Sequence, residues 1–206
     1  MSVSSTQIFS GGCAGKCSRD LVEDVIEICR SEGHDIEWSD CNTIPEGEGE
    51  LIQSVDLINQ IVPDPETFGR IAAAHACSDI YVAGGVPVTC NMILGIPRGT
   101  SVDMIRDAVR GAAQFMHQNE VKIGGGHTIH SQVLQIGFSV IGRRLQSLTM
   151  QNVVDGDYLI LTKPLGTGLM SNSLTSGEPN HTHKSELYSR LMESNSSGVL
   201  LYNHQE

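Results

Sequence analysis

Residues 11–16, Gly-Gly-Cys-Ala-Gly-Lys, bring a thiol, an amine and three glycines together within six positions. Glycines let a backbone approach a phosphate closely, and a lysine supplies a point charge for it. A neighbouring ammonium also favours the thiolate of Cys13, the nucleophilic form of a cysteine. The stretch departs from a P-loop, which needs glycine at Ser10 and Ser or Thr at Cys17. It therefore indicates either a catalytic loop containing Cys13 and Lys16, or an N-terminal tail without a fixed structure.

Three separated aspartates, Asp40, Asp56 and Asp79, are candidate ligands for Mg²⁺ and for a nucleotide held through it. Asp56 is the most informative, because an aspartate on an apolar strand is costly to bury unless it is paired or bound to a metal. Mg²⁺ is commonly held by one or two carboxylates together with phosphate oxygens. His75 precedes Asp79 by one helical turn and is predicted to face the same way. Each aspartate taken singly is also compatible with a helix cap or a solvated loop.

Two further glycine-rich stretches follow predicted strands. Gly124-Gly125-Gly126 precedes His127 and Thr128, and successive glycine amides there can form an anion-binding nest or simply a turn. Residues 161–168, Leu-Thr-Lys-Pro-Leu-Gly-Thr-Gly, end a predicted strand in a turn before a helix. A helix N-terminus at that place would suit a phosphate, although an ordinary strand-to-helix loop has the same pattern.

The hydrophobic periodicity predicts an α+β order of elements that would position these residues. Asp64 followed by Pro65 is typical of a helix start. Helices are expected over 20–31, from 64 to about 84, over 101–119 and over 185–192; strands over 51–58, 88–96, 121–123, 133–141 and 158–162; and a loop over 37–49. Residues 178–206 are polar and are predicted to form a tail.

Composition narrows the function classes. The net charge of −11, from 13 basic and 24 acidic residues, argues against nucleic-acid binding, which needs a Lys/Arg face. No window of eighteen apolar residues and no basic, apolar leader is present, so we expect a cytoplasmic protein without a membrane contact.

The chain has six cysteines, which we expect to be reduced thiols, with Cys29 and Cys90 in the core. The alternative is a zinc site that includes Cys13 and Cys17.

Taken together and in this order, the four stretches resemble the selenophosphate synthetases (selenide, water dikinases), in the superfamily of aminoimidazole-ribonucleotide synthetase-like ATP enzymes. The likeness runs from about Gly11 to Gly168. Its most specific parts are residues 54–87, SVDLINQIVPDPETFGRIAAAHACSDIYVAGGVP, and the LTKPLGTG stretch. The GGHT stretch is shared with other members of the superfamily.

The resemblance implies ATP and Mg²⁺ as cofactors, and conversion of ATP, selenide and water to selenophosphate, AMP and phosphate. Cys13 takes the place of the family's catalytic cysteine or selenocysteine, and Lys16 that of its essential lysine. The implied metal ligands are Asp40 and Asp79. The implied nucleotide contacts are Lys16, Asp56, Asp79, Gly125, Gly126, His127 and Thr128.

The resemblance also implies an architecture: a catalytic loop over 1–19, an ATP-binding domain over 20–177 with a mixed sheet that can form a homodimer, and a truncated tail over 178–206 in place of the family's C-terminal domain. Family members usually carry Asn at the place of His75. This departure favours a second reading, a catalytically silent homologue that acts as a regulatory or interaction subunit. A third reading, a related enzyme acting on a purine or thiamine precursor, is disfavoured by Cys13 with Lys16.

Overall fold

The computed structural model describes residues 19–34, 41–46, 49–145, 154–158, 160–161, 163–175 and 181–202. They form an α+β fold, as the sequence predicted. The element order is α1 (Arg19–Ser31), β1 (Asn42–Glu46), β2 (Gly49–Asn59), α2 (Pro65–Val82), β3 (Gly85–Pro97), α3 (Val102–Gln118), β4 (Lys122–Ser131), β5 (Gln135–Arg144), α4 (Thr167–Thr175), α5 (His181–Met192) and α6 (Ser197–Tyr202). The candidates Cys13, Lys16 and Asp40 lie outside the described residues.

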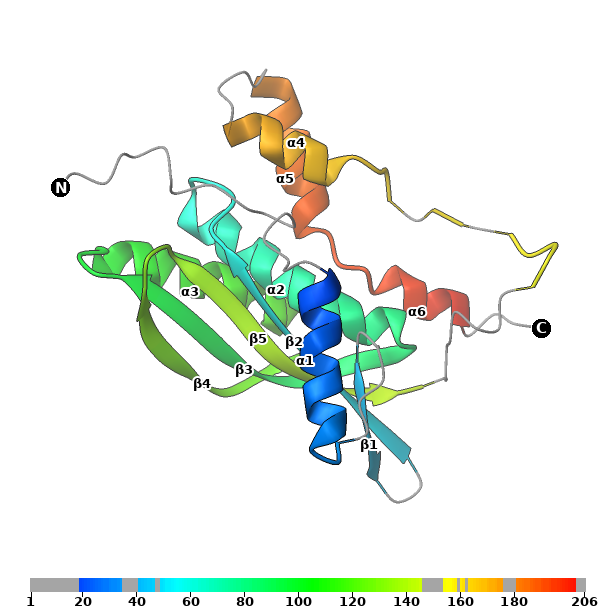
Figure 1. The fold of residues 1–206 in the computed structure, drawn as a ribbon. Helices are drawn as coiled ribbons and strands as arrows, with labels where there is room; N and C mark the ends of the chain where they lie inside the picture. The colour runs from blue at the N-terminus through cyan, green and yellow to red at the C-terminus, as the bar shows by residue number, and fades with distance from the viewer. Residues whose placement is uncertain are drawn as a thin grey trace.

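The five strands form one mixed sheet in the order β1-β2-β5-β3-β4. Strand β5 is antiparallel to both of its neighbours, β2 and β3, whereas β3 and β4 are parallel. Parallel neighbours need a crossover connection, and α3 provides it between β3 and β4. Figure 1 shows α2 and α3 against one face of this sheet.

Helix α2 is buried on two sides, by the sheet and by α3. Its start is fixed locally, because the Asp64 carboxylate accepts a hydrogen bond of 2.7 Å from the main-chain N–H of Thr67. Glycines bring the backbones of α2 and α3 into contact. A Cβ at Gly69 would come within 1.9 Å of the carbonyl oxygen of Ala108, and one at Gly111 within 1.9 Å of that of Glu66.

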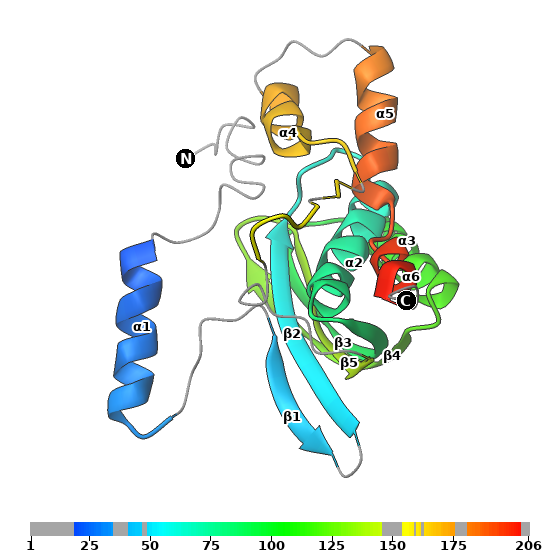
Figure 2. The same cartoon turned by 90° about the vertical axis from the view of Figure 1, so that its right-hand side faces the viewer.

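The sheet has one covered face and one open face. Along β2, alternate residues point toward α2, among them the buried Ile52 and Ser54. The residues between them point the other way, and Val55 and Leu57 are 61% and 46% exposed. Figure 2 shows α2 and α3 on one side of the strands, with α1 standing apart from the sheet.

Several sequence-based expectations about elements are corrected. The predicted loop over 37–49 contains β1, an edge strand that pairs with β2 through its backbone and needs no apolar pattern. The described residues of 158–162 form no strand, and Tyr158 and Leu161 are exposed. The apolar face of α1 is not buried: Val25 is 51% exposed, and Cys29 is only half-buried, whereas Cys90 is buried as expected.

Residues 181–202 contain more helix than the sequence predicted, which was one short helix over 185–192. Helix α5 begins at His181, four residues before the predicted start, and its Leu187 is 2% exposed. Helices α5 and α6 both contact α2. None of the helices within the described part of the chain is long and apolar enough to cross a membrane.

Candidate active site

A cluster of polar side chains lies between β2 and α2. The Ser54 hydroxyl donates a hydrogen bond of 2.8 Å to Asp79 Oδ2, and His75 Nε2 lies 3.7 Å from Asp56 Oδ1. Two residues along a strand span about 6.6 Å, and four along a helix span about 6 Å. Because these spacings match, Ser54 and Asp56 on one face of β2 meet Asp79 and His75 on one face of α2.

The carboxylates of Asp79 and Asp56 are both partly buried. Burial raises the pKa of Asp79; the Ser54 hydrogen bond opposes this rise, the charge of Asp56 adds to it, and His75 opposes it. The side chain of Asp56 is 25% exposed. Its Oδ2 atom is buried and has no hydrogen-bond partner among the described residues. A buried carboxylate oxygen without a partner carries a desolvation cost that a bound cation would offset.

The carboxylate pair fits Mg²⁺ bound together with a phosphate. No three His, Cys, Asp or Glu side chains form a metal site in the part of the chain that the structure describes. Mg²⁺ does not need such a site, since it is usually bound by one or two carboxylates plus water and substrate phosphate oxygens. Asp56 and Asp79 are the residues that would hold it here.

The predicted glycine-rich nest is instead part of a strand. Gly125, Gly126, His127 and Thr128 are exposed residues of β4, which runs through the glycines because they pair with β3. A Cβ at Gly126 would meet the Met92 carbonyl oxygen at 2.2 Å, so this glycine is required by the pairing. Two strands separate β4 from β2, a distance of about 14 Å, so a single chain does not bring this stretch against Asp56.

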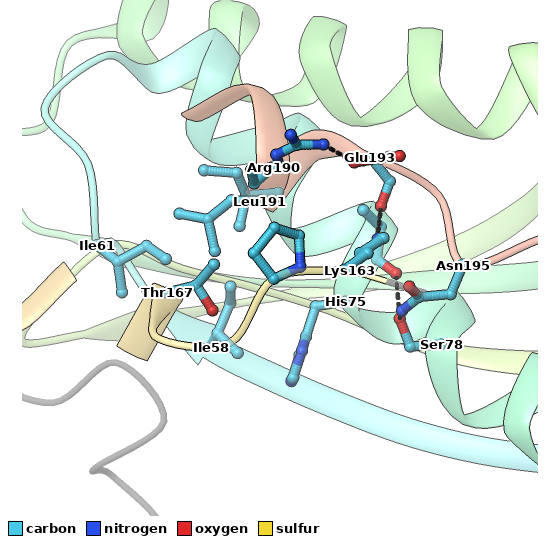
Figure 3. A pocket seen from close by; sticks show the side chains of 13 residues that line it. Ile58, Ile61, His75, Ser78, Lys163, Thr167, Arg190, Leu191, Glu193 and Asn195 are labelled. Carbon is cyan, nitrogen blue, oxygen red and sulfur yellow. Dashed lines mark hydrogen bonds and ion pairs between the residues drawn. The ribbon is translucent and has the colours of Figure 1, made fainter. Parts of the chain in front are cut away.

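A cavity of about 250 Å³, with His75 among its lining residues, lies between α2, the turn before α4 and the end of α5. Asn195 Nδ2 donates a hydrogen bond of 2.8 Å to Ser78 Oγ, and Lys163 Nζ donates one of 2.5 Å to the main-chain oxygen of Glu193 (Figure 3). These bonds fasten the segment after α5 to α2 and to the turn. Burial lowers the pKa of Lys163; Glu193 opposes this shift and Arg190 adds to it.

Apart from His75, the residues that line this cavity were not singled out as site residues from the sequence. Lys163 belongs to a recognised stretch, but Arg190, Glu193 and Asn195 lie in the segment predicted as a tail. One feature of the sequence could have indicated that this segment packs against the rest of the fold. Leu187 and Leu191 are apolar and spaced by four residues, as on the buried face of a helix.

Residues 38–144 match the family described as AIR synthase related protein, N-terminal domain. The chain is 42% identical over 130 residues to the selenide, water dikinase of Pelobacter propionicus, covering 62% of this chain and 37% of that protein. It is 33% identical over 207 residues to the one of Geobacter metallireducens, covering 94% of this chain and 60% of that protein. The chain thus spans 60% or less of the length of these two relatives.

Solved structures share the fold. The structure described as AaThiL complexed with AMPPCP and TMP has a TM-score of 0.70 and 16% identity, covering 93% of this chain and 65% of that one. Thiamine monophosphate kinase from Aquifex aeolicus has a TM-score of 0.69 and 16% identity, covering 91% of this chain and 66% of that one. At such identity the likeness concerns the fold alone.

Proposed function

The chain belongs to the family of AIR synthase related proteins, and on this basis we propose that it takes part in Mg²⁺-dependent phosphoryl transfer from ATP to selenide. The reaction would convert ATP, selenide and water to selenophosphate, AMP and phosphate. The similarity to selenide, water dikinases over 94% of this chain supports this substrate choice. Since the chain spans only part of the length of those relatives, their activity is a proposal for this chain.

The observation that carries the proposal is that the buried Oδ2 of Asp56, beside Asp79, has no hydrogen-bond partner within the described part of the chain. Mg²⁺ bound by these carboxylates would neutralise the charge of the polyphosphate. Ser54 orients the Asp79 carboxylate, and the burial of both aspartates strengthens their hold on a cation. We assign Cys13 to selenide handling and Lys16 to a phosphate, and propose Gly125, Gly126, His127 and Thr128 as further nucleotide contacts.

A selenide-dependent assay of AMP release tests the proposal. Asp56→Asn and Cys13→Ser should each lower AMP release at least about tenfold. The matched control is Asp103→Asn, an exposed aspartate on α3 that should leave the rate unchanged. Only Asp56→Asn should also weaken binding of Mg-ATP. Full activity of Asp56→Asn would show that the carboxylate pair is not the metal site.

The contact between His75 and Asp56 favours a second candidate function, that of a catalytically silent regulatory or interaction subunit. His75 Nε2 lies 3.7 Å from Asp56 Oδ1, so His75 and a metal would compete for that carboxylate. Under this reading the chain binds Mg-ATP weakly and releases no AMP. Replacing His75 by Asn would then raise the affinity for Mg²⁺, whereas an active enzyme with wild-type His75 would exclude the reading.

We also propose that the protein forms a homodimer through the open face of its sheet. Val55 and Leu57 on β2 and Val88 on β3 are large apolar side chains that are 61%, 46% and 45% exposed. Apolar surface that is concentrated on one face of a sheet favours burial against a partner. A second copy presents the same face, as the isologous interfaces of symmetric dimers require.

A further inference from the structure

Among the residues that the structure describes, more cationic than anionic side chains line the cavity beside His75. Lys163 and Arg190 both line it, and Glu193 is the carboxylate among the lining residues. Glu193 Oε2 lies 3.4 Å from Arg190 Nη1, which pairs these two charges. Lys163 Nζ instead bonds to the main-chain oxygen of Glu193, a neutral acceptor. The lining therefore has an excess of positive charge at Lys163.

The rest of the lining is largely apolar. Ile58 at the end of β2, Ile71 on α2 and Leu191 on α5 face the cavity, as Figure 3 shows for Ile58 and Leu191. Ser78 and Asn195 are polar, but they bond to each other. The volume of about 250 Å³ lies just below the range of roughly 300–1,000 Å³ that is typical for drug-sized ligands. A whole nucleotide is too large for it, whereas a single ring or a short branched chain fits.

We propose that this cavity binds a small organic monoanion, a carboxylate carried on a compact apolar body of about one ring. The carboxylate would pair with Lys163, and the apolar body would lie against Ile58, Ile71 and Leu191. The burial that lowers the pKa of Lys163 is a cost that an anion beside the ammonium offsets. This site goes beyond the proposed phosphoryl transfer, which does not call for an organic acid.

Because its walls come from α2, the turn before α4 and the end of α5, an occupied cavity would hold these segments together. A ligand that binds the folded form only raises the stability of that form. Binding should therefore raise the melting temperature in proportion to the logarithm of ligand concentration. His75 also lines the cavity, so the ligand would lie next to the side chain that contacts Asp56.

The test uses benzoate as the probe and isoleucine δ1-methyl NMR of the full chain as the readout, without nucleotide or selenide. The methyl signals of Ile58, Ile61 and Ile71 should shift saturably, while that of Ile129 on β4 should not. Benzamide, a neutral molecule of the same shape, should bind at least about tenfold more weakly. Lys163→Met should lower benzoate affinity by a similar factor, and Lys122→Met on β4 should leave it unchanged.

Three outcomes would overturn the proposal. Equal binding of benzamide and benzoate would show that the charge of Lys163 plays no part. Inorganic phosphate or pyrophosphate shifting the same methyls as strongly would make the cavity part of a phosphate site. No saturable shift up to about 10 mM benzoate would exclude the ligand class. The benzamide comparison uses the unmodified chain, so it holds even if Lys163→Met fails to fold. AMP release is measured separately, so failure here leaves the proposed enzymatic function untouched.

Discussion

The hydroxyl of Ser54 on β2 donates a hydrogen bond of 2.8 Å to Asp79 Oδ2 on α2, across 25 residues of sequence. This bond ties the helix to the sheet and fixes the orientation of one carboxylate of the candidate metal site. It also favours the charged form of a carboxylate that burial disfavours. We therefore expect the charged form of Asp79 to lower the stability of the metal-free fold, although metal binding requires that form.

Asp79→Asn should make the metal-free protein more stable at neutral pH. Since the folded-state pKa of Asp79 is raised above the usual value of 3.8, the folded form binds more protons above that pH, and stability falls as pH rises. Asparagine does not ionise, so the variant avoids this fall, and its free energy of unfolding at pH 7 should rise by up to about 1 kcal/mol. Urea unfolding at pH 7 and pH 3.5 should show the gain only at pH 7. Ser54→Ala, which removes the opposing hydrogen bond, should destabilise the protein at pH 7.

Binding of an ATP analogue should require Mg²⁺. A polyphosphate that approaches Asp56 and Asp79 without a bridging cation meets like charges in a partly desolvated place. Titration calorimetry should show at least about tenfold weaker binding in EDTA, and the same loss in Mg²⁺ for Asp56→Asn. Asp103→Asn is the matched control. Equal affinity with and without Mg²⁺ would rule out the carboxylate pair as a metal site.

Alanine substitutions at two neighbouring glycines of β4 should distinguish an effect on stability from an effect on nucleotide binding. The nearest atom to a Cβ at Gly125 would be 3.4 Å away, whereas a Cβ at Gly126 would meet a main-chain oxygen at 2.2 Å. Gly126→Ala should therefore destabilise the protein by about 2 kcal/mol or more. Gly125→Ala should leave the melting temperature within a few degrees and weaken nucleotide binding. Unchanged nucleotide affinity would remove Gly125 from the proposed contacts.

Gly111→Ala should separate α2 from α3. The added methyl would meet the Glu66 carbonyl oxygen at 1.9 Å, and neither backbone can move without disturbing the core. We expect a loss of about 2–4 kcal/mol in urea unfolding. Gly168→Ala in α4 is the control, because no atom of a described residue lies within 4 Å of a Cβ there and alanine favours helices. Similar stabilities of the two variants would contradict the close contact of α2 with α3.

Val55→Asp should abolish self-association if the open sheet face is the dimer interface. A charge in the middle of that face would have to be buried without a partner. Light scattering after size exclusion should report a dimer for the unmodified chain and a monomer for the variant, with unchanged circular dichroism. Val25→Asp on α1, which is also exposed, should remain dimeric. A monomeric unmodified chain would refute the homodimer itself.

Elements with local signals could be predicted from the sequence. Asp64 before α2 and Ser101 before α3 each accept a hydrogen bond from a main-chain N–H three residues later, so the cap and its target are neighbours in the chain. The helical spacing of apolar residues predicted the bounds of α3 to within one residue at either end. Asp56 could likewise be proposed from the sequence as a candidate site residue, because an aspartate among apolar strand residues needs a partner.

The tertiary structure alone decided which residues meet. The sequence pointed to Asp56, His75 and Asp79 as candidates. Their meeting depends on how α2 lies across β2, because only that packing places Asp56 beside His75 and Ser54 beside Asp79. Strand β1, the extension of β4 through its glycines, and the cavity formed with α5 all depend on partners far away in the chain. Strand pairing and helix packing are set by such non-local contacts, which leave no fixed spacing in the sequence.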